Sequence, residues 1–350
     1  MTVEKIYWDK ARSGEDIFLY PIKNNKGMRV EISNFGATIV GLYVPDKNGT
    51  IENVVMGYDK LSDYYQNWHS IGCSVGPNAN RIAGAKFVLD GKEYHLEAGR
   101  DGHNLHSHYS LGYQKRIWLV DKYEENEITF LCECAEGEMG FPGNKINRIT
   151  FTVTDENELK IHYYVTTDKR TIVNMTNHSY FNLSGNLSSS IKNHILWLAC
   201  SHYTPIDENT IPTGELKKVT DSVMDFTLGK RLLDGLESGS ELLKKTKGYD
   251  HNFCVDDWDG SLKKIGQLYE EKSGRCMEVF SDLPGVQIYT ANYLGICKGR
   301  NKKIYKTHGA ICMETQYFPN HINEENFVSA IFDADHPYDS TTIYKFSIKP

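Results

Sequence analysis

Short segments in which apolar and polar residues alternate run along most of this chain, and clusters of turn residues separate them. Residues 28–45 contain two such segments broken at residues 34–36, and residues 85–96 contain two more around Asp90-Gly91. Alternation with a period of two is typical of a half-buried strand, and Asp-Gly is a favoured turn of a two-residue hairpin. The same pattern recurs at residues 127–134, 146–167, 194–200, 275–282, 286–294 and 341–348.

Helical periodicity is weak by comparison. The two candidate helices are residues 60–65 and residues 228–245, and three glycines interrupt the second. No linker-like run of proline and glycine and no internal repeat divides the chain. We therefore expect residues 1–350 to form one all-β domain, a large antiparallel β-super-sandwich.

Composition narrows the class of ligand. The sequence has 39 lysines and arginines against 46 aspartates and glutamates, a net charge of −7, and contains no basic block. Nucleic acids and anionic membranes bind concentrated basic patches, so we expect neither as a partner and expect a neutral small molecule instead. No segment approaches the roughly 18 consecutive apolar residues of a membrane-spanning helix. The oligomeric state stays open.

Cysteine spacing and the first residues of the chain bear on compartment and cofactors. The eight cysteines lack the two-residue gap of a zinc knuckle or a redox motif, and the N-terminal residues are charged rather than apolar. These features predict reduced thiols in a cytoplasmic protein. The sequence also lacks a Gly-rich phosphate cradle, a GxSxG elbow and an HExxH helix, so we expect no bound cofactor.

A first candidate for chemistry is the polar run within residues 172–183. If this segment is extended, alternate side chains share one face, which would carry Asn174, His178, Tyr180 and Asn182 together with the threonine at position 176. A hydrogen-bonding face with a central histidine suits the concave side of a sheet that binds a polyol. Alternatively, the face is solvated and the histidine is incidental.

A second candidate is Glu314, which lies between Met313 and Thr315 in an apolar strand. Carboxylates are rarely buried unless they are paired or functional. Partial desolvation would raise the pKa of this carboxyl toward the range of a general base. Alternatively, Glu314 sits at a strand end and points into solvent.

Three further motifs contain polar side chains in turn-rich surroundings. Arg81 can donate hydrogen bonds to oxygens or form a surface salt bridge, and Asp250 can bind a hydroxyl or stabilise a turn. His103, His106 and His108 have the spacing of a partial zinc site that would need a ligand from elsewhere. We expect no metal there.

Several motifs, taken in order, resemble the aldose 1-epimerase (galactose mutarotase) family, and the resemblance covers almost the whole chain. The runs TNHSYFNLSG and YTPIDENTIPTGEL are its most specific parts. The matching segments are NRIAGAKF (80–87), NLH (104–106), TNHSYFNLSG (176–185), YTPIDENTIPTGEL (203–216), GYDHNF (248–253), GVQIYTANYL (285–294) and METQYFPN (313–320). The resemblance implies a β-super-sandwich whose open face holds a sugar.

The resemblance also implies a cofactor-free reaction, the interconversion of the α and β anomers of a free aldose, galactose or glucose above all. His178 matches the general acid of the family and Glu314 its general base. The base takes the proton of the anomeric O1 while the acid protonates the ring oxygen O5, so that the ring opens. Rotation about C1–C2 and reclosure then give the other anomer.

Six further positions match the sugar pocket of the family. Those that hold hydroxyls and orient the ring are Arg81, His106 and Asp250. Additional pocket positions are Asn80, Tyr180 and Gln287.

The sequence departs from the family pattern beside the expected pocket. Pro77 stands where an arginine is common, and Ser107-His108 stand where two glycines are usual. These departures bear on which sugar is preferred more than on the reaction. Two alternative functions are also considered. A sugar-phosphate epimerase would need more basic side chains than Arg81, and a non-catalytic sugar-binding module would not need both an acid and a base.

Overall fold

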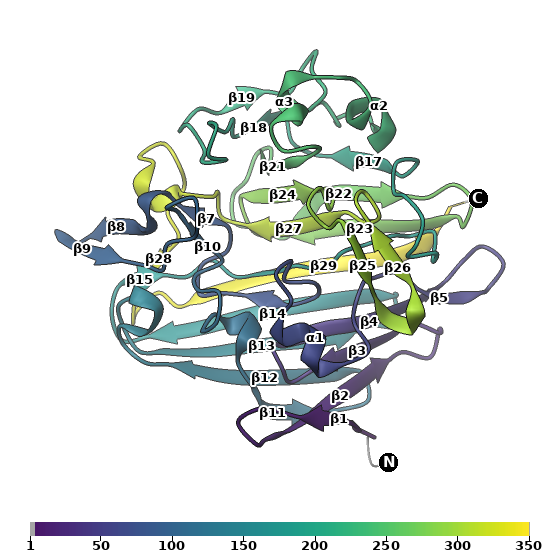
Figure 1. Ribbon diagram of the computed structural model, residues 1–350, viewed down its shortest axis with the longest axis horizontal. Coiled ribbons are helices and arrows are strands. Elements are labelled where there is room, and N and C mark those ends of the chain that lie inside the picture. The colour runs from purple at the N-terminus through teal and green to yellow at the C-terminus, as the bar shows by residue number, and fades with distance from the viewer. Residues whose placement is uncertain (1–3, 350) are drawn as a thin grey trace.

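The computed structural model of the protein describes residues 4–349, and most of its regular secondary structure is antiparallel sheet (Figure 1). The largest sheet of the described residues has nine strands. Its strands in spatial order are β11 (Leu119–Tyr123), β12 (Glu127–Cys134), β13 (Lys145–Val153), β14 (Glu158–Thr167), β29 (Tyr338–Ile348), β23 (Arg275–Ser281), β22 (Lys263–Tyr269), β17 (Ile195–Leu198) and β20 (Lys230–Arg231).

Two sheets of five strands accompany it. The N-terminal sheet contains β1 (Ile6–Lys10), β2 (Asp16–Lys23), β3 (Arg29–Ser33), β4 (Thr38–Pro45) and β5 (Ile51–Asn53). The other sheet, which we call the site sheet, contains β19 (Lys217–Lys218), β18 (His202–Tyr203), β21 (Asp250–Cys254), β24 (Gly285–Tyr289) and β27 (Cys312–Gln316).

The remaining elements are short. The paired strands are β6 (Ser74–Val75) with β16 (Thr176–Asn177), β7 (Arg81–Ile82) with β10 (Asn104–Leu105), β8 (Lys86–Leu89) with β9 (Lys92–His95), β15 (Thr171–Ile172) with β28 (Ile331–Phe332), and β25 (Ile296–Lys298) with β26 (Ile304–Lys306). The α-helices are α1 (Leu61–Tyr65), α2 (Leu232–Leu236) and α3 (Glu241–Lys244), and one-turn 3₁₀ helices occur at Ala83–Ala85, Tyr113–Lys115, Glu138–Gly140, Arg300–Lys302 and His321–Asn323. None of the helices in residues 4–349 is long and apolar enough to cross a membrane.

Both five-stranded sheets pack on the nine-stranded sheet through apolar faces. At the N-terminal end, the ring of Tyr20 on β2 meets Phe130 on β12 edge to face, with 5.8 Å between ring centroids. In the site sheet, the core-facing side chains include Ile288 and Met313, which share a hydrophobic core with Tyr344 of β29. The Tyr344 hydroxyl also donates a hydrogen bond of 3.0 Å to the carbonyl of Met313. This core contains residues from Tyr20 to Phe346.

The predicted fold class, an all-β antiparallel super-sandwich, is confirmed. The alternating segments become strands because every second side chain is buried, as in β14, where positions alternate between buried and half-exposed along almost its whole length. The hairpin expected at residues 85–96 forms, and Asp90 and Gly91 have φ angles of 52° and 76°, as its turn type requires. The helical candidate at residues 228–245 forms only the short helices α2 and α3.

The packing of the site sheet on the nine-stranded sheet can be tested by removing apolar volume from it. Ile288→Ala should lower the free energy of unfolding by about 2–5 kcal/mol, because the side chain is fully buried between the sheets. Val88→Ala on the surface hairpin is the control, since Val88 is 57% exposed and its loss should change stability by less than about 0.5 kcal/mol. Equal shifts in a urea unfolding titration would contradict this packing.

Candidate active site

A polar cavity of about 210 Å³ opens over the face of the site sheet that points away from the core. The eight residues that match the site of the family all line this cavity. These are Asn80, Arg81, His106, His178, Tyr180, Asp250, Gln287 and Glu314. The volume is below the range of about 300–1,000 Å³ that is typical of drug-sized ligands, so it suits one small molecule.

The register of the site sheet builds the floor of the cavity. Gln287 on β24 pairs with Glu314 on β27, and Asp250 on β21 pairs with Tyr289 on β24. Residues directly opposite one another, and residues two apart on one strand, share a face, so all four of these side chains point to the cavity. Gln287 also donates a hydrogen bond of 2.7 Å from Nε2 to the carboxylate of Asp250.

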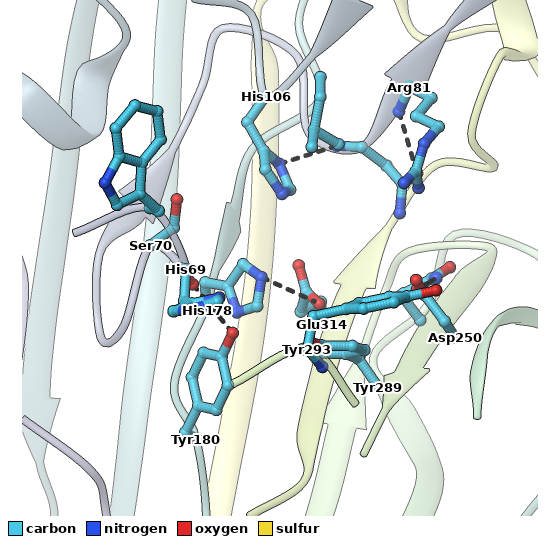
Figure 2. A pocket seen from close by; sticks show the side chains of 14 residues that line it. His69, Ser70, Arg81, His106, His178, Tyr180, Asp250, Tyr289, Tyr293 and Glu314 are labelled. Carbon is cyan, nitrogen blue, oxygen red and sulfur yellow. Dashed lines mark hydrogen bonds and ion pairs between the residues drawn. The ribbon is translucent and has the colours of Figure 1, made fainter. Parts of the chain in front are cut away.

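Glu314 and His178 meet at the bottom of the cavity (Figure 2). Glu314 Oε1 lies 3.7 Å from His178 Nε2, and the two residues are 2% and 6% exposed. Within residues 4–349, neither Glu314 Oε2 nor His178 Nδ1 has a hydrogen-bond partner. The expectation that Glu314 could point into solvent is therefore wrong, and each group has one buried polar atom that no other described residue satisfies.

Burial shifts the pKa values of this pair in opposite directions. Desolvation raises the pKa of Glu314 well above its usual value, the neighbouring Asp250 adds to this shift, and Arg81 opposes it. Desolvation lowers the pKa of His178 to about 3. Both shifts favour the neutral form of each group in the empty cavity.

Aromatic rings hold His178 in place. Tyr180 stacks on the imidazole with 5.0 Å between centroids and an interplanar angle of 8°, and Tyr289 meets it edge to face at 6.2 Å. The Tyr180 hydroxyl donates a 2.9 Å hydrogen bond to the backbone carbonyl of His69. The hydroxyl of Tyr180 is thus engaged, and its ring packs against His178.

His106 and Arg81 lie across the cavity from Glu314, as Figure 2 shows. The backbone N–H of Asn80 donates to His106 Nδ1 at 3.2 Å, so the neutral ring carries its hydrogen on Nε2. Burial, with the nearby His178 and Arg81, lowers the pKa of His106 well below its usual value. His106 is therefore a neutral hydrogen-bond donor, and Arg81 is the charged one.

The alternatives for Arg81 and Asp250 can now be decided. No ion pair links Arg81 to another of the described residues, and its Nε has no partner among them, so the surface salt bridge does not form. Asp250 begins β21 rather than stabilising a turn, and burial raises the pKa of its carboxyl, although Arg81 and Gln287 oppose that shift. Both side chains are available to hold hydroxyl groups.

The structure corrects the expectation for residues 172–183. Only positions 171–172 and 176–177 lie in strands, so the segment is not one continuous strand with a polar face. Asn174 and Asn182 donate hydrogen bonds to backbone carbonyls of neighbouring loops, and only His178 and Tyr180 reach the cavity. The solvated alternative is also wrong, because every residue of the segment is buried.

The three histidines near position 106 do not converge on one point. His103 Nδ1 accepts a hydrogen bond from the backbone of Gly84, and His108 Nδ1 lies 3.2 Å from a carboxylate oxygen of Glu97. Only His106 lines the cavity.

The residues that depart from the family pattern, Pro77 and Ser107-His108, are not among those that line the cavity. Ser107, with a φ of 66°, is fixed by two hydrogen bonds of its hydroxyl to the backbone of residue 78.

Six lining residues were missed by the sequence analysis. They are Trp68, His69, Ser70, Leu105, Tyr289 and Tyr293. Tyr289 and Tyr293 belong to a segment that resembles the family, but an aromatic residue in a strand usually indicates core. Trp68 is 70% exposed and stacks on Tyr109 at the rim, and no local pattern marks it as part of a site.

Comparison with known proteins agrees with this geometry. The family model described as aldose 1-epimerase matches residues 19–345. Human galactose mutarotase is 37% identical over 328 residues, 92% of each chain, and the aldose 1-epimerase of Haemophilus influenzae is 35% identical over 341 residues, 96% of this chain and 97% of its own. A crystal structure of an aldose epimerase homologue from C. elegans superposes with a TM-score of 0.87 at 28% identity, covering 95% of this chain and 99% of its own. The chain belongs to the aldose 1-epimerase family.

Proposed function

We propose that the protein binds a free monosaccharide in this cavity and interconverts its α and β anomers, with Glu314 as the base and His178 as the acid. As a member of the aldose 1-epimerase family, it is an isomerase. The observation that carries the proposed roles is the buried pair itself, a carboxyl and an imidazole 3.7 Å apart at the bottom of a small polar cavity, each with one atom that no other described residue satisfies. Galactose and glucose are the aldoses we propose.

The reaction needs one proton to leave O1 and one to reach O5. Glu314 removes the proton from O1 while His178 donates its proton to O5, the C1–O5 bond breaks, and a carbonyl forms at C1. Rotation about C1–C2 presents the opposite face of the carbonyl to the O5 hydroxyl. Reclosure returns the proton from O5 to His178 and the proton on Glu314 to O1, so that both groups recover their starting states.

The pair therefore holds a single proton that moves between its members. Ring opening starts with ionised Glu314 and protonated His178, and it ends with protonated Glu314 and neutral His178. Burial favours the second distribution when the cavity is empty. We infer that a bound sugar shifts the balance, because its O1 hydroxyl donates a hydrogen bond that stabilises the carboxylate.

The other lining groups supply donors and acceptors for hydroxyls. Arg81 and the Nε2 hydrogen of His106 donate from one side, and Asp250 accepts from the other. The Oε1 atom of Gln287 has no partner among residues 4–349 and is free to accept a hydrogen bond. We propose that these groups, together with Asn80, orient the ring so that O1 faces Glu314.

The charge of the cavity disfavours a phosphorylated sugar. Among the described residues that line it, Arg81 is the only lysine or arginine, and it faces two carboxyl groups, Asp250 and Glu314. A dianionic phosphate would need further basic donors. A binding module without catalysis would have no use for a desolvated carboxyl, which is costly to keep without a partner.

Two broader expectations stay part of this proposal. All eight cysteines are free thiols, which supports a reducing compartment such as the cytoplasm. The largest hydrophobic core includes residues from Tyr20 to Phe346, which supports one domain.

Replacing the base tests the proposed roles directly. Glu314→Gln should lower the rate of anomer interconversion by about 10²–10⁴-fold, since the amide keeps the shape of the side chain but cannot accept the O1 proton. Sugar binding, measured by calorimetry, should stay close to that of the wild type. Glu241→Gln on α3 is the control, because its side chain is 86% exposed and does not line the cavity. Near-normal turnover in Glu314→Gln would exclude this carboxyl as the base.

The protonation state of the empty cavity is a separate prediction. In protein labelled with ¹⁵N-histidine, the ring of His178 should stay neutral from about pH 8 to about pH 5, because burial lowers its pKa to about 3. Its two nitrogens should then show the unequal chemical shifts of a neutral imidazole, and His178→Asn assigns the signal. Two protonated nitrogens at neutral pH in the sugar-free protein would contradict the conclusion that burial keeps His178 neutral.

A further inference from the structure

A buried thiol lies directly behind the proposed acid and base. Cys312 is two residues before Glu314 on β27, so both side chains emerge on the same face of the strand. Cys312 is fully buried and is a free thiol. A ring nitrogen of His178, the sulfur of Cys312 and a carboxylate oxygen of Glu314 all lie within 4.8 Å of one another.

These three groups are the ligand types that zinc prefers. Zinc binds thiolate sulfur at about 2.3 Å and imidazole nitrogen or carboxylate oxygen at about 2.0–2.2 Å, so neighbouring ligand atoms of a tetrahedral site lie roughly 3.5 Å apart. The 3.7 Å between Glu314 Oε1 and His178 Nε2 is already close to that separation. The sulfur of Cys312, within 4.8 Å of both other ligand atoms, would be the third corner of the triangle of ligands.

Unsatisfied polar atoms also point to a cation at this place. Glu314 Oε2 and His178 Nδ1 are buried and have no hydrogen-bond partner among residues 4–349. Asp250 is a second carboxyl group beside Glu314, and Arg81 is the only lysine or arginine among the described residues that line the cavity. A divalent cation held between Glu314 Oε1 and His178 Nε2 would displace the proton that burial keeps on the Glu314 carboxyl, and its charge would then compensate that of the carboxylate.

We propose that His178, Cys312 and Glu314 form a three-ligand site for a thiophilic divalent cation, zinc above all, and that the bound ion inhibits the enzyme. Three protein ligands leave the fourth position of a tetrahedral zinc open for a water molecule. The ion occupies the lone pairs with which Glu314 accepts the O1 proton and His178 holds the O5 proton. Its inhibitory effect rests on the proposed function, whereas its binding does not.

Metal binding can be measured without any turnover. Calorimetry of the chelator-treated full chain should show one zinc site and no heat of binding for Mg²⁺, because a hard cation prefers an all-oxygen ligand set. Cys312→Ser and Glu314→Gln should each weaken zinc binding by more than about tenfold. Cys297→Ser is the matched control, since this partly exposed cysteine on β25 is not one of the three ligands and its loss should leave the affinity unchanged.

Cobalt provides an independent signature of the thiolate ligand. Co²⁺ added to the wild type should give the near-ultraviolet charge-transfer band of a cobalt–thiolate bond, and Cys312→Ser should abolish that band while Cys297→Ser keeps it. If Cys312→Ser does not fold, Glu314→Gln still tests the site by calorimetry. Absence of zinc binding in the wild type, or equal affinity in wild type, Cys312→Ser and Glu314→Gln, would overturn the proposal.

Because zinc would bind the proposed acid and base, we expect zinc and sugar to compete for the site. Zinc should slow anomer interconversion at concentrations that match its measured affinity, chelation should restore the rate, and excess galactose should weaken zinc binding. If the protein binds zinc as described but does not interconvert anomers, the proposed function fails and the metal site stands. If turnover is normal and insensitive to saturating zinc, the inhibitory role is wrong.

Discussion

The desolvation of Glu314 beside His178 is the constraint around which the rest of the site is arranged. A carboxyl group loses several kcal/mol of hydration free energy when it is taken out of water without a compensating partner. Here one oxygen of Glu314 lies 3.7 Å from an imidazole that burial itself keeps neutral, and the other oxygen has no partner among residues 4–349. The fold must therefore supply enough packing elsewhere to hold this pair out of water.

The super-sandwich meets that requirement by using the two faces of the site sheet differently. Side chains such as Ile288 and Met313 anchor β24 and β27 to the nine-stranded sheet. Their neighbours Gln287 and Glu314 are thereby fixed on the opposite face, where they form the floor of the cavity. Stability and chemistry thus depend on the same strands, and the strand register determines which residues serve each purpose.

The sequence predicts the fold class and the eight site residues because each depends on local pattern or on motif resemblance. Glu314 stands out as a charge inside an apolar strand, and His178 as the centre of a polar run. The hydrogen-bond partners of Asn174 and Asn182, on either side of His178, could not be predicted in the same way. Asn174 and Asn182 bind loop backbones instead of lining the cavity, because the segment bends away from a regular strand after every few residues.

The protonation states of His178 and Glu314 are the property of the site that the sequence predicts least well. The expectation of a protonated His178 follows from the chemistry of ring opening, but the stacked ring of Tyr180 and the edge of Tyr289 exclude water from the imidazole. That exclusion depends on long-range packing and not on any spacing in the chain. It also implies that the empty cavity favours the proton distribution of the open-chain sugar, so that the closed sugar must help to create the charged pair.

Polarimetry of freshly dissolved α-D-galactose, with EDTA present throughout, tests the central claim most directly. The account predicts that purified protein accelerates the change in optical rotation and leaves the final value unchanged, because a metal-independent acid and base speed both directions equally. Rotation that relaxes at the uncatalysed rate in the presence of folded protein, for galactose and for glucose, would contradict it.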